Sequence, residues 1–113
     1  MSFYNLYVGD ASDPKFNWDG GDFSGNIPAV MLDLGGLGLF GCAAARNMLE
    51  SPRYGGRVLD WGASGARLNK AQILEFVSDY FKSGNYCTLS VQKLQRIQTL
   101  ADDRDYILFA CEQ

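Results

Sequence analysis

The sequence predicts a single α+β domain in which a mixed sheet of about four strands carries two C-terminal amphipathic helices on one face. Three observations lead to this prediction. The chain has 113 residues, of which 47% are hydrophobic, so residues 1–113 can bury one core but not two. Short runs of aromatic, β-branched and other apolar residues stand between turn residues, which is typical of strands. Two segments of the second half repeat apolar residues at helical spacing.

The first half is expected to hold three strands and a short helix. Residues 3–8 are rich in aromatic and β-branched residues and predict a strand. Residues 9–26 combine Gly, Asp, Asn, Ser and Pro, which predicts a long acidic and aromatic loop. The continuous apolar run at 27–34 is typical of a strand covered on both faces. A short helix at 42–49 and a strand at 57–60 follow.

The second half is expected to hold two helices and a terminal strand. Asn69 and Gln72 are spaced as a capping box at the start of the first helix. Ser90 is the expected N-cap of the second helix. Residues 106–111 form a buried terminal strand. Taken over all elements, the predicted buried set is Leu6, Val30, Leu32, Val58, Ile73, Phe76, Val77, Tyr80, Leu94, Ile97, Ile107 and Phe109.

The long loop is the first candidate site. Residues 1–40 hold five aspartates against one lysine, a local charge of −4 within a net charge of −3. Aromatic residues are interleaved with these acids, as they are at the centres of many protein interfaces. The predicted partner-binding residues are Asp10, Asp13, Phe16, Trp18, Asp19, Asp22 and Phe23. The alternative is that the aromatic rings fold back over the core while the aspartates remain in water.

A glycine pattern is the second candidate site. Gly36, Gly38 and Gly41 form Gly-x-Gly-x-x-Gly between an expected strand and the short helix. Asp60 stands about twenty positions further on, where an acid can bind a ribose in dinucleotide-binding folds. These four residues predict, as an alternative function, a nucleotide or phosphate site. A tight strand-to-helix turn explains the same glycines, and the C-terminal half does not repeat the strand–helix alternation.

The sequence does not favour an enzyme, and no catalytic residue is assigned. There is no histidine, which removes the usual activator of serine and cysteine nucleophiles and the commonest transition-metal ligand. The acidic loop does not match a calcium-binding EF-hand, because Lys15 and Asn26 would stand at the first and twelfth ligand positions, where acids are required. We therefore expect no bound metal and no resident cofactor.

The environment of the chain is expected to be the cytoplasm. The apolar runs are interrupted by Asp33 and by glycines, so no segment predicts a membrane span. The N-terminal residues lack the charge and apolar core of a signal peptide. Three widely spaced cysteines fit a reducing compartment better than a disulfide framework. An acidic surface repels phosphate backbones, which makes nucleic acid an unlikely partner.

These observations together predict a small acidic protein-binding domain. Its function is expected to resemble that of an inhibitor or immunity protein that covers a basic functional surface of a partner. Nucleotide or phosphate binding through the glycine pattern is one alternative. A structural or accessory subunit of an oligomer, joined through strand edges, is another. The residues identify no family, and the oligomeric state stays open.

Overall fold

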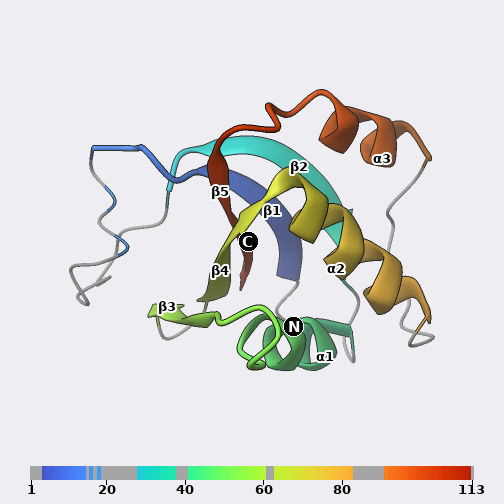
Figure 1. Ribbon diagram of the computed structural model, residues 1–113. Coiled ribbons are helices and arrows are strands. Elements are labelled where there is room, and N and C mark those ends of the chain that lie inside the picture. The colour runs from blue at the N-terminus through green and yellow to red at the C-terminus, as the bar shows by residue number, and fades with distance from the viewer. Residues whose placement is uncertain are drawn as a thin grey trace.

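A computed structural model describes residues 4–14, 16, 18, 28–37, 41–60, 63–82 and 91–112. In this part of the chain one antiparallel sheet of five strands is combined with three helices (Figure 1). The elements in chain order are β1 (Tyr4–Asp10), β2 (Val30–Gly36), α1 (Gly41–Leu49), β3 (Arg57–Asp60), β4 (Ala63–Asn69), α2 (Lys70–Lys82), α3 (Val91–Gln98) and β5 (Asp105–Glu112). The strand order across the sheet is β2-β1-β5-β4-β3.

The predicted α+β class is confirmed, but the predicted sheet was wrong in two respects. All four strand pairs are antiparallel rather than mixed, and there are five strands rather than about four. The strand that was not predicted is β4. The short helix expected at 42–49 is present as α1, which with the two C-terminal helices makes three. Residues 63–66 of β4 are all buried, so the strand lacks the alternation of apolar and polar residues by which strands are detected.

Small residues in β4 allow this close packing. A Cβ atom added to Gly65 would lie 2.8 Å from Cδ1 of Leu59 and 3.0 Å from Cβ of Phe109. Ser64 is fully buried, and its Oγ accepts a hydrogen bond from Arg46 Nε at 3.0 Å and donates one to Glu50 at 3.2 Å. Residues 63–66 of β4 are therefore held by close approach to their neighbours and by polar contacts to Arg46 of α1 and to Glu50 just after it.

One face of the sheet, here called the helix face, packs against all three helices. Leu6, Val8, Leu68 and Leu108 of the strands share one core cluster with residues of α1, α2 and α3. The predicted apolar stripe of α2 is buried at Ile73, Phe76, Val77 and Tyr80. The capping box is also confirmed, because Gln72 N donates to Asn69 Oδ1 at 2.9 Å and Asn69 N donates to Gln72 Oε1 at 3.0 Å.

The opposite face, here called the loop face, is covered by the segment that follows β1. Ile107 and Phe109 of the central strand β5 form a second core cluster with Phe16, and Ala11 and Trp18 pack against it. Phe16 is 4% exposed. The burial of residues 106–110 confirms the prediction of a buried terminal strand, because a central strand with both faces covered needs apolar side chains on each.

Two predicted core residues are exposed. Val30 and Val58 lie on the outer strands β2 and β3 and are 50% and 47% exposed. Leu32 and Leu94 are only partly buried against the core, while the other eight predicted core residues are buried. The apolar run at 27–34 predicts a strand covered on both faces, but the strand observed there, β2, is at the edge of the sheet. Apolar composition does not distinguish a central strand from an edge strand.

Among the described residues, no helix has the length and apolar character needed to span a bilayer.

Candidate functional site

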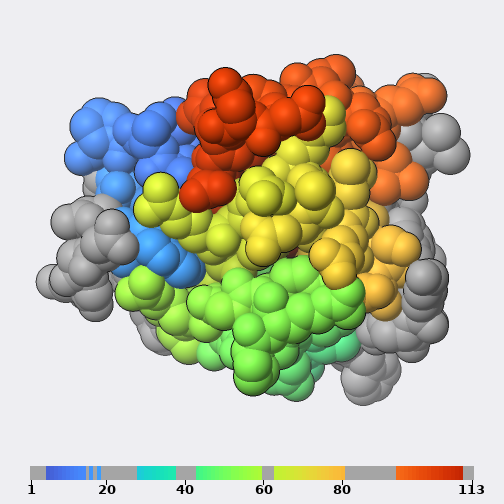
Figure 2. All heavy atoms as spheres, viewed as in Figure 1, coloured from blue at the N-terminus to red at the C-terminus, as the bar shows by residue number. Residues whose placement is uncertain are grey.

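The described structure contains an open groove of about 700 Å³. It lies between the loop that follows β1 and the loop that joins α3 to β5. Figure 2 shows these two segments in contact on the surface, in blue and red at the upper left. The lining residues are Ala11, Ser12, Arg67, Asn69, Asp102, Asp103, Arg104 and Asp105.

Strand pairing brings these residues together. In the antiparallel registers Asp10 at the end of β1 lies opposite Tyr106, and Asn69 at the end of β4 lies opposite Asp105. The ends of β1 and β4 therefore meet the start of β5 at one end of the sheet. The loops attached to these strand ends must share that end, although residues 10 and 104 are far apart in sequence.

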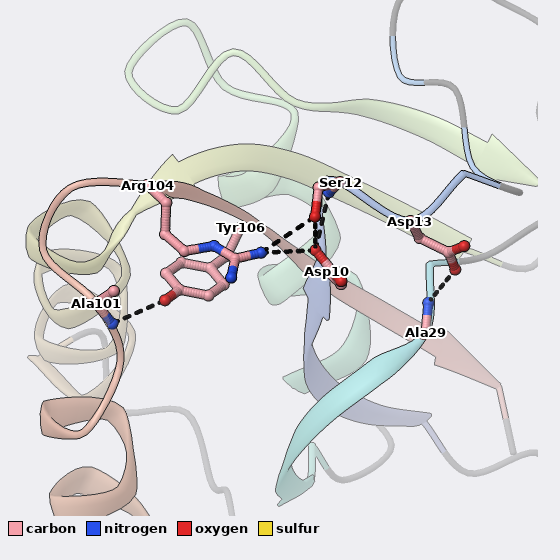
Figure 3. A network of polar contacts seen from close by, with 7 residues as sticks. All are labelled: Asp10, Ser12, Asp13, Ala29, Ala101, Arg104 and Tyr106. Atoms are coloured by element: carbon pink, nitrogen blue, oxygen red, sulfur yellow. Dashed lines mark hydrogen bonds and ion pairs between the residues drawn. The ribbon is translucent and has the colours of Figure 1, made fainter.

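Asp10 is the centre of a polar network at this end (Figure 3). Its Oδ1 accepts hydrogen bonds from the backbone N of Ser12 at 2.9 Å and from the Ser12 hydroxyl at 2.6 Å. Arg104 Nη2 lies 2.8 Å from the same oxygen. The two Ser12 bonds, and to a smaller extent the Arg104 charge, hold the pKa of the Asp10 carboxyl below its usual value.

Arg104 is positioned by an aromatic ring as well. Its guanidinium carbon lies 5.2 Å from the ring centroid of Tyr106, a distance at which cation–π attraction operates. The Tyr106 hydroxyl accepts a hydrogen bond from the Ala101 backbone N at 2.8 Å. Arg104 therefore joins the loop after β1 to the start of β5, while Tyr106 holds the loop that leads into β5.

Arg67, the second cation that lines the groove, and Lys70 next to Asn69 are also paired. Arg67 Nε lies 3.1 Å from Asp105 Oδ2, and Lys70 Nζ lies 3.3 Å from Asp102 Oδ1. Lys70 also donates to the Gln98 carbonyl at the end of α3, at 2.8 Å. Asp103 is exposed and has no hydrogen bond or ion pair within the part of the chain that the structure describes. The groove thus carries more carboxylates than its cations neutralise.

The predicted partner-binding residues lie in different environments. Asp10 lies beside the groove through its contacts with Ser12 and Arg104, whereas Asp13 points toward Ala29, whose backbone N donates a hydrogen bond to Asp13 Oδ2 at 2.9 Å (Figure 3). Phe16 is buried in the loop-face core, as in the alternative in which the aromatic rings fold back over the core, and its contact with a partner stays a prediction. Trp18 is half-buried, with the Arg57 guanidinium carbon 4.1 Å from its ring centroid. Asp19, Asp22 and Phe23 lie outside the described residues.

Sequence reasoning missed the acidic residues of the second loop. Asp102, Asp103 and Asp105 stand in one short run that was visible in the sequence. The sequence alone assigned no role to that run. The register of β1 against β5 was needed to place it beside Asp10.

The residues of the glycine pattern are spread over separate elements. Gly36 is the last residue of β2 and pairs with Asn5, Gly41 is the first residue of α1, and Asp60 is the last residue of β3. Gly38 lies outside the described residues. β2 and β3 are the two opposite edges of the sheet, whereas a dinucleotide site lies between neighbouring parallel strands. Nucleotide or phosphate binding stays a prediction that this arrangement does not favour.

A thermal-shift assay separates the two interpretations of the glycines. We expect millimolar NAD, NADP or ATP to leave the melting temperature unchanged. A nucleotide at about a hundredfold excess over its dissociation constant would instead add about 2.7 kcal/mol of stability. Sulfate at matched ionic strength is the control, because it stabilises many proteins without binding to a site. A shift with nucleotide that sulfate does not reproduce would contradict the expectation.

The described residues offer little for other chemistry. They contain no group of three or more Cys, Asp or Glu side chains arranged to hold a metal ion. The carboxylates of the groove can attract positively charged groups. Their positions are set by the strand ends and by ion pairs with Arg67 and Arg104. A search for related proteins found no matching family model, curated protein or solved structure.

Proposed function

We propose that this chain is a small acidic protein-binding domain that covers a basic surface of a partner, as an inhibitor or immunity protein does. The binding surface is the acidic end of the sheet, defined as Asp10, Asp13, Asp102, Asp103 and Asp105. The observation that carries the proposal is the meeting of two acidic loops at one groove. Asp102, Asp103 and Asp105 line this groove together with Arg67 and Arg104, and ion pairs join Asp10 to Arg104 and Lys70 to Asp102.

The charge pattern suits rapid and selective association. Carboxylates on one end of a small protein attract a basic partner over several ångströms and orient it before contact. The internal ion pairs hold Asp10, Asp102 and Asp105 in place, so less side-chain entropy is lost when a partner binds. Asp103 is left to meet a cation of the partner.

The burial of Phe16 changes how the predicted interface would work. In the structure this ring stabilises the loop-face core, so the proposal depends on charge rather than on aromatic anchors from the described residues. Asp19, Asp22 and Phe23 keep their place as candidate contacts. The three widely spaced cysteines fit a reducing environment, and we propose a cytoplasmic location for the complex.

The test compares two variants of equal charge. Asp103→Asn and Gln95→Lys each raise the net charge by one, but Gln95 is exposed on α3, outside the groove. We expect Asp103→Asn to slow association with the partner by about two- to fivefold and to weaken its salt dependence, because rim charges act through steering. Gln95→Lys should leave both nearly unchanged.

The partner is first captured from the native cell by cross-linking to the wild-type chain, and the rates are then measured by surface plasmon resonance. Equal effects of the two variants would show that the association rate depends on the net charge of the chain and not on the position of the charge, which would contradict the proposed binding surface. An unchanged rate with Asp103→Asn, or a captured partner whose contact surface is acidic, would contradict the proposed binding surface.

A further inference from the structure

Two consecutive turns lead the chain away from β1. The backbone N of Asp13 donates to the Asp10 carbonyl at 3.2 Å, and the backbone N of Phe16 donates to the Asp13 carbonyl at 3.0 Å. Hydrogen bonds between residues three apart are those that close β-turns. The turns bring Phe16 onto the loop face, where it packs with Ile107 and Phe109.

The first turn, residues 10–13, replaces one bond of the β1–β2 ladder. Asp10 N donates to the Ala29 carbonyl at 3.0 Å, next to the paired residues Gly9 and Val30. Two residues paired in this way in an antiparallel sheet ordinarily exchange a second bond, here from Ala29 N to the Asp10 carbonyl. The Asp10 carbonyl is instead bonded to Asp13 N within the turn, and Ala29 N donates to Asp13 Oδ2 at 2.9 Å (Figure 3). A carboxylate oxygen therefore takes the place of a backbone carbonyl.

The residue before Ala29 fits closely against the sheet. A Cβ atom added to Gly9 would lie 2.6 Å from Cγ of Pro28 and 2.8 Å from Cε1 of Phe109. Pro28 is buried and occupies the space that a side chain at Gly9 would need. The chain that leaves β1 and the chain that enters β2 are therefore held together by a ladder bond, by the Asp13 carboxylate and by this close contact.

From these contacts we infer that Asp13 is a positioning residue of the acidic end, and that it acts as a hydrogen-bond acceptor rather than as a charge offered to a partner. Its half-buried side chain holds the first turn to the chain that enters β2. That turn contains Asp10 and Ser12, and Arg104 contacts both of them. For its part in binding, this role rests on the proposed function, whereas its part in holding the turn does not.

Two variants of equal charge separate the acceptor from the charge. Asp13→Asn removes the charge but keeps an oxygen that can accept the bond, whereas Asp13→Ala removes both. Hydrogen exchange of the Ala29 amide, followed by NMR, should be about three- to tenfold faster in Asp13→Ala than in Asp13→Asn, the range expected for one lost hydrogen bond. Asp103→Ala and Asp103→Asn are the control pair on the exposed side of the groove, and their Ala29 exchange rates should be the same.

The pKa of the Asp10 carboxyl provides a second readout, because the Ser12 bonds within the turn hold it below its usual value. Both Asp13 variants remove the same neighbouring charge, so a difference between them comes from the acceptor. We expect carbon-13 NMR titration to show a higher Asp10 pKa in Asp13→Ala than in Asp13→Asn, since a looser turn weakens the Ser12 bonds.

Binding of the captured partner gives the third comparison. The Asp13→Ala protein should dissociate faster than the Asp13→Asn protein, because an ordered turn loses less entropy on binding, while the two Asp103 variants should dissociate at equal rates. An Asp13→Asn protein whose Ala29 exchange is as fast as that of Asp13→Ala would overturn the inference, as would equal Asp10 pKa values in the two. Both of these measurements are made without a partner, so a failure of the proposed binding surface is distinguishable from a failure of the role of Asp13.

Discussion

Val77→Asp is expected to unfold the domain at room temperature. Val77 is 2% exposed on the side of α2 that packs against the helix face of the sheet. The substitution would bury a carboxylate with no partner, which costs several kcal/mol whether the group is charged or becomes protonated. Domains of this size commonly have a total stability of about 5–15 kcal/mol. Far-ultraviolet circular dichroism and thermal melting measure the loss directly.

Ser78→Asp is the matched control, because it introduces the same side chain at an exposed position one residue further along the same helix. Its melting temperature should stay within a few degrees of the wild type, since surface substitutions rarely change stability by more than about 0.5 kcal/mol. Ile97→Asp in α3, where Ile97 is fully buried, should behave like Val77→Asp. A Val77→Asp protein that melts with the wild type would show that the buried face of α2 has been assigned incorrectly.

Phe16→Ala is expected to lower the free energy of unfolding by about 3–5 kcal/mol, the usual range for a buried phenylalanine. The reason is that Phe16, in the segment after β1, packs in one cluster with Ile107 and Phe109 of the central strand. Urea denaturation followed by tryptophan fluorescence measures the change. Such a loss would identify the segment after β1 as part of the core.

Trp18→Ala is the comparison for this experiment. Trp18 is half-buried and its ring centroid lies 6.4 Å from that of Phe16, so its removal should destabilise the domain by less than Phe16→Ala; far-ultraviolet circular dichroism follows unfolding of this variant. The opposite order would mean that Trp18 is the main cover of the loop face. If neither variant changes stability by more than about 0.5 kcal/mol, the loop does not cover the sheet, and its aromatic residues regain the role of surface anchors.

Local signals in the sequence were sufficient for several elements. The capping box at Asn69 and Gln72 and the apolar stripe that includes Val77 located α2, because a helix is specified by contacts between residues close in sequence. The apolar run at 106–110 located the central strand β5. The acidic character of the first 40 residues was also evident from the sequence, and it included Asp10.

Contacts distant in sequence decided the rest. β4 is recognisable as a strand only beside Leu59 and Phe109, because its small residues are explained by how closely these neighbours approach Gly65. Val30 was expected in the core and is exposed, and for Phe16 the sequence left open whether it binds a partner or covers the core. Val30 is exposed because its strand is at the sheet edge, and Phe16 is buried because it packs against Ile107 and Phe109 of the central strand.

The acidic end shows the same division between sequence and structure. Composition determined that the chain carries surplus negative charge, and turn residues determined that this charge lies in loops. Only the pairing of Asp10 with Tyr106 decided that Asp102, Asp103 and Asp105 join it at one groove. Hydrophobic periodicity records which residues of a strand share a face, but it contains no information on which strand lies beside it. That choice belongs to the tertiary structure.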